Sequence, residues 1–138
     1  MFPPTTRFLL VDDMEPLRRI VRNMLKELGY KEVEESAGAL EAIQALERIQ
    51  KSGRNVDIIL SDWSMPGMTG LEFLQFVRAT EGLKSIPFVM ITAEGQREQI
   101  LAAIQAGVSS YLIKPFSLAQ FQDKLKGVWI KLNGKPAD

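Results

Sequence analysis

Residues 56–62 (VDIILSD) decide the fold of this chain, because a short apolar run ends there in a carboxylate. Such a run, at residues 56–60, is typical of a strand buried on both faces of a parallel sheet. Similar runs stand at residues 7–11 (RFLLV), 88–91 (FVMI) and 111–113 (YLI), and a weaker polar one at residues 32–35 (EVEE). The sequence therefore predicts five strands, of which the one at residues 56–60 is the most clearly buried.

Each predicted strand is followed by apolar residues at intervals of three and four, the spacing of one helix face. These patterns predict helices over residues 17–28, 39–49, 73–77, 100–104 and 118–132. Pro16 stands in the first turn of the first helix, where its missing N–H costs nothing, and Gly29 and Gly107 end the first and fourth helices. The alternation indicates an α/β fold, a doubly wound parallel sheet with right-handed crossovers and helices on both faces.

The composition is that of an ordinary globular domain, with 138 residues, 46% hydrophobic and 25% charged. We expect a single domain over residues 1–138, with a core at about residues 7–132 and a tail at residues 133–138. Lys and Arg number 17 and balance 17 Asp and Glu, so the field that attracts nucleic acid or anionic membranes is missing. No apolar run approaches the roughly 20 residues of a membrane span, and the first residues lack the order of a secretory signal. We therefore expect a cytoplasmic monomer with no nucleic-acid or membrane partner.

The sequence contains no Cys and no His. Disulfides, thiolate and imidazole metal sites, Cys nucleophiles and Ser-His catalysis are thereby excluded. Any chemistry must use Asp, Glu, Lys, Ser, Thr or Tyr side chains.

Polar residues stand directly after four of the predicted strands. These residues are Asp12 and Asp13 after the first strand, Asp62 after the third, Thr92 after the fourth and Lys114 after the fifth. Because the carboxyl ends of parallel strands meet at one edge of the sheet, we expect all five side chains in one crevice. Each of them taken alone has an ordinary explanation as a helix cap, a turn residue or a solvated cation.

Taken together, these side chains favour a functional site. Three crowded carboxylates repel one another and raise each other's pKa unless a cation lies among them. Oxygen ligands without Cys or His select a hard divalent ion such as Mg²⁺. Lys114 and Thr92 add a charged donor and a hydroxyl, which suit the oxygens of a phosphoryl group. The sequence therefore predicts magnesium-dependent phosphoryl transfer to a carboxylate.

Four segments carry a family resemblance: residues 11–13 (VDD), 62–70 (DWSMPGMTG), 91–94 (ITAE) and 111–116 (YLIKPF). They resemble the receiver domains of two-component response regulators, and the likeness runs over about residues 8–132. Within that family, residues 18–23 (RRIVRN) and 26–29 (KELG) are most similar to the chemotaxis response regulators of the CheY type. The resemblance implies a flavodoxin-like, CheY-like sheet of five strands in the order 2-1-3-4-5, with five helices.

The resemblance also implies roles for the residues of the crevice. Asp62 corresponds to the phosphoacceptor, which takes the phosphoryl group from a phosphohistidine on a sensor histidine kinase. Asp13, Asp62 and the backbone carbonyl of Ser64 correspond to direct Mg²⁺ ligands, and Asp12 to a ligand that acts through bound water. Lys114 corresponds to the lysine that pairs with the acid cluster and then with the phosphoryl group, and its bond to Pro115 is expected to be cis.

A switch is implied as well. Thr92 corresponds to a hydroxyl that is drawn toward the phosphoryl oxygens and so vacates space for Tyr111. This movement would couple the site to an output face made by the fourth helix, fifth strand and fifth helix. Arg97 and Lys124 match basic positions of that face, and Glu94 stands where the family sets the rate of phosphoryl loss.

Several positions depart from the chemotaxis pattern: Met14, Ser64, Thr69, Gly95 and Gln96. Because the family's rate of phosphoryl loss depends on the positions of Ser64 and Glu94, that rate stays open for this chain. The departures leave the phosphorylation chemistry intact.

We interpret the chain as a single-domain response regulator, a signalling switch and not an enzyme, that controls the flagellar motor in chemotaxis. The alternative within the family is a stand-alone or excised receiver that signals to a non-motor effector. Outside the family, a flavodoxin-like FMN carrier would need a Ser/Thr/Gly-rich phosphate loop where Asp12 and Asp13 stand. A phosphohydrolase of the haloacid dehalogenase type would need an Asp-x-Asp pattern after the first strand, which this sequence lacks.

Three further features allow two interpretations each. Trp63 is either a binding residue or a partly exposed loop aromatic. The pair Phe73 and Phe76 is either a docking patch or core, and helical spacing favours core for Phe73. The charged side chains of the first helix meet a kinase or form a solvated face, the second being the more common case: Glu15, Arg18, Arg19 and Arg22.

Overall fold

The computed structural model describes residues 1–134 and shows five strands that alternate with five helices. The strands are β1 (Arg7–Val11), β2 (Glu32–Ser36), β3 (Ile58–Ser61), β4 (Phe88–Thr92) and β5 (Ser110–Ile113). The helices are α1 (Glu15–Glu27), α2 (Ala39–Lys51), α3 (Gly70–Ala79), α4 (Arg97–Gln105) and α5 (Leu118–Asn133). All neighbouring strands pair in parallel, in the order β2-β1-β3-β4-β5. The predicted fold class is therefore confirmed.

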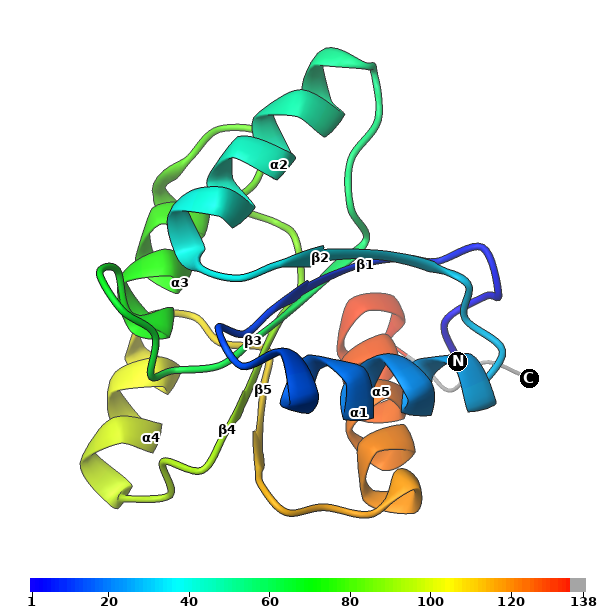
Figure 1. Ribbon diagram of the computed structural model, residues 1–138, viewed down its shortest axis with the longest axis vertical. Helices are drawn as coiled ribbons and strands as arrows, with labels where there is room; N and C mark the ends of the chain where they lie inside the picture. The colour runs from blue at the N-terminus through cyan, green and yellow to red at the C-terminus, as the bar shows by residue number, and fades with distance from the viewer. Residues whose placement is uncertain (135–138) are drawn as a thin grey trace.

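The helices cover both faces of the sheet, with α1 and α5 on one side and α2, α3 and α4 on the other (Figure 1). Successive side chains of a strand point to opposite faces. In β1, Leu9 therefore packs toward α2 and α3, whereas Phe8 packs toward α1 and α5. Phe73 of α3 is fully buried, which confirms its expected place in the core. Full burial of one such side chain stabilises the fold by roughly 1.5–3 kcal/mol.

Side chains close the N-termini of two helices that flank the carboxyl edge of the sheet. Thr69 and Glu72 form a reciprocal capping box at α3, and Ser117 and Gln120 form another at α5. Each box satisfies backbone N–H groups that the first helical turn leaves free. The loop after β3 therefore ends at the cap residue Thr69, and the loop after β5 ends at the cap residue Ser117.

Some predicted boundaries are wrong by one or two residues. β3 begins at Ile58 and not at Val56, because the strand pairing starts at Phe8 and Ile58. Asp57, which precedes β3, is exposed, and its carboxylate accepts a hydrogen bond from the backbone N–H of Arg7 at 2.8 Å. α5 extends to Asn133, and Gly134, whose φ of 74° suits glycine, is its C-cap. The rest of the predicted tail, residues 135–138, lies outside the described residues.

The segment before β1 packs against the last helix, which no sequence pattern predicted. The ring of Phe2 lies 5.3 Å from that of Trp129 in an edge-on arrangement, and Phe2 is buried. Tyr30 donates a 2.8 Å hydrogen bond from its hydroxyl to the backbone carbonyl of Phe2. These contacts lie at the amino ends of the strands, opposite the edge where the predicted site residues stand.

Residues 1–134 contain no helix with both the length and the apolar character needed to cross a bilayer.

Candidate functional site

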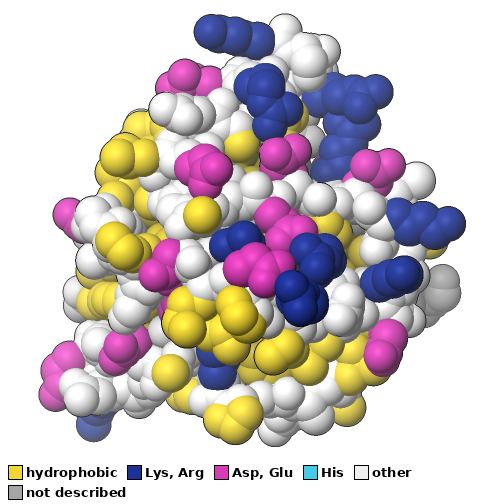
Figure 2. All heavy atoms as spheres, in the orientation of Figure 1, with side chains coloured by type: hydrophobic (Ala, Val, Ile, Leu, Met, Phe, Trp, Pro, Cys, Tyr) yellow, Lys and Arg dark blue, Asp and Glu magenta, His cyan; other side chains and the backbone are white. Residues whose placement is uncertain are grey.

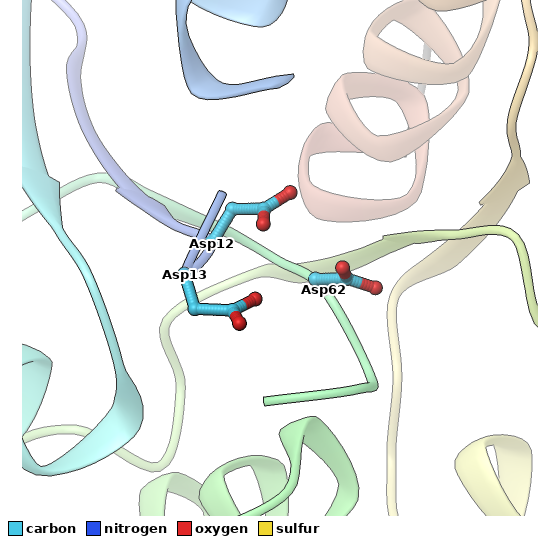
Figure 3. Close-up of side chains that lie close together, drawn as sticks. All are labelled: Asp12, Asp13 and Asp62. Carbon is cyan, nitrogen blue, oxygen red and sulfur yellow. The ribbon is translucent and has the colours of Figure 1, made fainter. Parts of the chain in front are cut away.

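Three carboxylates meet at the carboxyl edge of the sheet. Asp12 and Asp13 directly follow β1, and Asp62 directly follows β3, the neighbouring strand. One oxygen atom from each of the three side chains lies within 4.8 Å of the others. Figure 3 shows the three side chains close together. Asp12 exposes 5% of its surface and Asp62 exposes 9%, whereas Asp13 is exposed. The structure thus brings together the three acidic residues that the sequence predicted.

Lys114 places its ammonium group against two of these carboxylates. Its Nζ atom lies 3.1 Å from Oδ2 of Asp12 and 3.4 Å from Oδ2 of Asp62. Its side chain is only 16% exposed, so the interpretation of Lys114 as a solvated loop cation is wrong. The bond between Lys114 and Pro115 is cis, as expected.

Burial raises the pKa of the Asp12 carboxyl above its ordinary value. A 3.0 Å hydrogen bond from the backbone N–H of Met14 and the charge of Lys114 oppose this effect without cancelling it. Burial therefore disfavours the charged form of Asp12 more than its partners favour it, and a bound cation would favour the charged form.

Neither Asp13 nor Thr92 acts as a helix cap, the ordinary role that each could have had. The residue that caps α1 is Met14, without a side-chain hydrogen bond, and α4 begins five residues after Thr92, at Arg97. The cap explanation is therefore wrong for both residues, which leaves their side chains available to the crevice.

The loop after Asp62 is fixed by its backbone. The N–H of Trp63 donates to Oδ1 of Asp62 at 2.7 Å, and the N–H of Gly70 donates to the carbonyl of Trp63 at 2.8 Å. A Cβ atom on Gly70 would lie 2.1 Å from the carbonyl oxygen of Asp62, so only glycine fits. The indole of Trp63 is half-buried against the α2 and α3 side of the core. The indole of Trp63 is thus partly exposed, and its backbone N–H holds the Asp62 carboxylate.

Glu94 connects the predicted switch residues. Its N–H donates to Oγ1 of Thr92 at 3.2 Å, and its carbonyl accepts a hydrogen bond from the hydroxyl of Tyr111 at 2.5 Å. Thr92 is 1% exposed. Burial, with the charges of Glu94 and Asp62, raises the pKa of Tyr111 to about 12. Tyr111 is therefore held as a neutral hydrogen-bond donor, facing inward from β5.

The remaining predicted positions lie at the rim and on the outer face. Ser64 is exposed, and its hydroxyl donates to Oε1 of Glu94 at 2.9 Å. Arg97 begins α4 and Lys124 lies on α5, and both are exposed. These two helices flank β5 (Figure 1), and neither Arg97 nor Lys124 belongs to the acid cluster.

The sequence analysis missed a contact from α1. Arg18, whose side chain is 14% exposed, donates from Nη1 to the backbone carbonyl of Asp12 at 2.6 Å. Glu35 of β2 pairs with Arg18 at 3.2 Å and with Arg22 at 2.6 Å. Arg18 is therefore neither a free kinase contact nor part of a solvated face. Arg19, in contrast, makes an exposed pair with Glu15 at 3.0 Å, as the solvated-face interpretation predicts.

Gln99 was missed as well. It lies in the first turn of α4, and its Nε2 atom donates to Oε2 of Glu94 at 3.1 Å. A glutamine five residues after a loop glutamate has no spacing that marks it in the sequence. Only the path of the loop between β4 and α4 brings the two side chains together.

The donor set fits a divalent cation. When all four groups are ionised, the three carboxylates and the ammonium group of Lys114 give the site two net negative charges. Every atom of the cluster that could bind a metal is an oxygen. Hard cations such as Mg²⁺ prefer such ligands. Figure 2 shows acidic side chains near the centre of this face with Lys and Arg side chains beside them.

This parallel sheet, with acidic residues, a lysine and a hydroxyl at its carboxyl edge, defines a phosphoacceptor signalling domain. A family model described as the response regulator receiver domain matches residues 8–126. The chain belongs to this family and is a signalling switch. Neither the FMN carriers nor the haloacid dehalogenase phosphohydrolases considered as alternatives belong to it.

Known relatives agree with this assignment. The chemotaxis protein CheY-3 of Vibrio cholerae is 44% identical over 126 residues, which are 91% of this chain and 93% of that protein. A crystal structure of V. cholerae CheY4 has a TM-score of 0.78 at 35% identity and covers 90% of this chain and 98% of that one. The receiver domain of a Pseudomonas aeruginosa sensor histidine kinase, solved with a magnesium ion in its active-site cleft, has a TM-score of 0.76 at 30% identity and covers 88% of this chain and 95% of that one.

Proposed function

We propose that the chain is a response regulator whose Asp62 accepts a phosphoryl group from the phosphohistidine of a sensor histidine kinase. One observation carries the proposal: Asp62 lies beside two further carboxylates and 3.4 Å from the ammonium group of Lys114, at the carboxyl edge of a receiver-type sheet. A carboxylate in this position is a nucleophile with a cation already in place for the group it receives.

In the transfer, a carboxylate oxygen of Asp62 attacks phosphorus while the bond from phosphorus to the kinase histidine breaks. The histidine nitrogen keeps the bonding electrons, and a proton taken from solvent by the other ring nitrogen lets the ring leave as a neutral imidazole. The second product is the aspartyl phosphate. Lys114, which touches Asp12 and Asp62 at rest, binds a phosphoryl oxygen. Thr92 donates its hydroxyl to another phosphoryl oxygen.

We propose Mg²⁺ as the cofactor, with Asp13, Asp62 and the backbone carbonyl of Ser64 as direct ligands and Asp12 acting through water. When bound, Mg²⁺ neutralises charge on the phosphoryl oxygens. The buried, crowded carboxylates support this assignment, as does the magnesium ion in the related P. aeruginosa receiver domain.

The output that we propose is a change of the face formed by α4, β5 and α5. When Thr92 turns toward the phosphoryl group, its bond from the Glu94 N–H is lost, and Glu94 also holds Tyr111. The face carries exposed apolar and basic side chains suited to a protein partner: Leu101, Ile104, Ile113, Arg97 and Lys124. Given the likeness to chemotaxis proteins, we propose the flagellar motor switch as that partner, with a non-motor effector as the alternative. We propose that residues 1–138 form one receiver domain that acts as a cytoplasmic monomer.

Intact mass after incubation with Mg²⁺ and acetyl phosphate tests the proposal. We expect a metal-dependent gain of one phosphoryl group in the wild type and in the control Asp123→Asn, whose exposed carboxylate lies on α5, but none in Asp62→Asn. The absence of any gain, together with a failure to bind beryllofluoride, would contradict the proposed chemistry.

The partner is tested separately. We expect the beryllofluoride-activated chain to bind a purified flagellar motor switch protein more tightly than the unactivated chain, and Lys124→Glu to remove the difference. Equal binding of both states would favour a non-motor effector.

A further inference from the structure

We infer that Gln99 is a positioning residue that acts through Glu94: together with Ser64 it holds the Glu94 carboxylate across the rim of the site and so slows the entry of anionic phosphodonors. This inference rests on the proposed function. It adds a residue of α4 to the groups that control the reaction at Asp62.

Every polar group of Glu94 is engaged. The two carboxylate oxygens accept hydrogen bonds from Ser64 at 2.9 Å and from Gln99 at 3.1 Å. The backbone N–H and carbonyl are bonded to Thr92 and Tyr111. Hydrogen bonds to a charged group are stronger than those between neutral groups, so the carboxylate has a defined position.

This position lies beside the reacting carboxylate. Ser64 lies two residues after Asp62, in the loop that follows β3, and Glu94 lies in the loop that follows the neighbouring strand β4. The hydrogen bond between Ser64 and Glu94 therefore joins these two loops. The charges of Glu94 and Asp62 both act on the hydroxyl of Tyr111. A fixed negative charge here repels a phosphodonor anion as it approaches Asp62.

The bond to Glu94 sets the orientation of the Gln99 amide group. Oε1 of Gln99 is buried and makes no hydrogen bond within residues 1–134. A buried amide oxygen without a partner is costly, so the orientation of this side chain requires a compensating interaction. The bond to the Glu94 carboxylate is the contact that the Gln99 side chain gains in return.

Release of this bond lets the Glu94 carboxylate turn away into solvent. We expect Gln99→Ala to raise the second-order rate constant of phosphorylation by acetyl phosphate about fivefold, the change that one net hydrogen bond makes to an equilibrium. Glu94→Ala should raise it by at least as much. The matched control is Gln105→Ala, an exposed glutamine at the C-terminal end of the same helix, which should leave the rate unchanged.

A double-mutant cycle distinguishes action through Glu94 from a structural effect. In the Glu94→Ala background, Gln99→Ala should have no further effect on the rate. The gain in the single variant should also shrink at high ionic strength, because salt screens the repulsion between Glu94 and the donor. A structural defect of α4 would produce neither result.

Two outcomes would overturn the inference, and a third would also contradict the proposed function. Additive effects in the cycle, or an unchanged rate in Gln99→Ala, mean that Gln99 does not act through Glu94. A wild-type chain that gains no phosphoryl group contradicts the proposed function, and the inference falls with it.

Discussion

The Nζ atom of Lys114 lies 3.1 Å from Oδ2 of Asp12, although 102 residues separate them in the chain. The pair joins the end of β5 to the end of β1, across the two intervening strands of the sheet. Both side chains are largely removed from solvent, so their attraction is weakly screened. The crevice is therefore held together by the same charges that the proposed reaction uses.

Removal of the Lys114 ammonium should destabilise the metal-free protein. We expect Lys114→Ala to lower the free energy of unfolding by about 3 kcal/mol, because it leaves buried carboxylates without a counter-charge. Mg²⁺ should restore more stability to this variant than to the wild type, since the cation replaces the missing charge. Urea unfolding with and without Mg²⁺ measures both effects. Lys126→Ala, an exposed lysine of α5, is the control, and an equal loss there would contradict the prediction.

Removal of one negative charge from the cluster should have the opposite effect on the metal-free state. We expect Asp13→Asn to stabilise the protein without metal, by up to about 1 kcal/mol, because like charges in close contact repel. The same change should weaken Mg²⁺ binding at least about tenfold, the loss typical of a disturbed metal site. Chemical unfolding measures the first effect, and quenching of Trp63 fluorescence by Mg²⁺ the second. Stabilisation without any loss of Mg²⁺ affinity would remove Asp13 from the ligand set.

Substitution of Gly70 should disturb Asp62 without touching its side chain. A Cβ atom at this position would overlap the Asp62 carbonyl oxygen, a backbone atom that cannot turn aside as a flexible side chain could. We expect Gly70→Ala to cost at least about 2 kcal/mol of stability and to slow phosphorylation. The control is Gly127→Ala on α5, where the added Cβ meets nothing within 4 Å and should be tolerated. Equal stability of both variants would show that the loop after β3 has a second conformation.

Both tyrosines should lose their phenolic protons at a higher pH than a free tyrosine does. The chain has two, and burial raises the pKa of both, that of Tyr111 to about 12. Because the fold favours the neutral phenol, the stability that Tyr111 contributes is complete below about pH 10 and is lost as the pH rises toward 12. Tyr111→Phe should flatten this part of the stability curve. Phenolate absorbance, followed in wild type and variant, gives the pKa directly, and a midpoint near 10 for Tyr111 would contradict its burial.

The sequence predicted the parts of this molecule that depend on chain order. Buried strands appear as continuous apolar runs, and the carboxyl ends of parallel strands meet, so Asp12, Asp62 and Lys114 could be placed in one crevice before any coordinates. The contacts of Arg18 with Asp12 and of Gln99 with Glu94 depend instead on how a loop turns and on which rotamer a long side chain adopts. No spacing in the sequence encodes either choice.

The contact between Phe2 and Trp129 gives the protein an internal optical reference. The chain has two tryptophans: Trp63 adjoins Asp62 at the carboxyl edge, and Trp129 packs against Phe2 at the amino ends of the strands. We therefore expect a cation or a phosphoryl group bound at Asp62 to change the emission of Trp63 and to leave that of Trp129 nearly constant. The emission of Trp129 therefore serves as a constant background for the change at Trp63, so the relative change in total emission should report site occupancy independently of protein concentration.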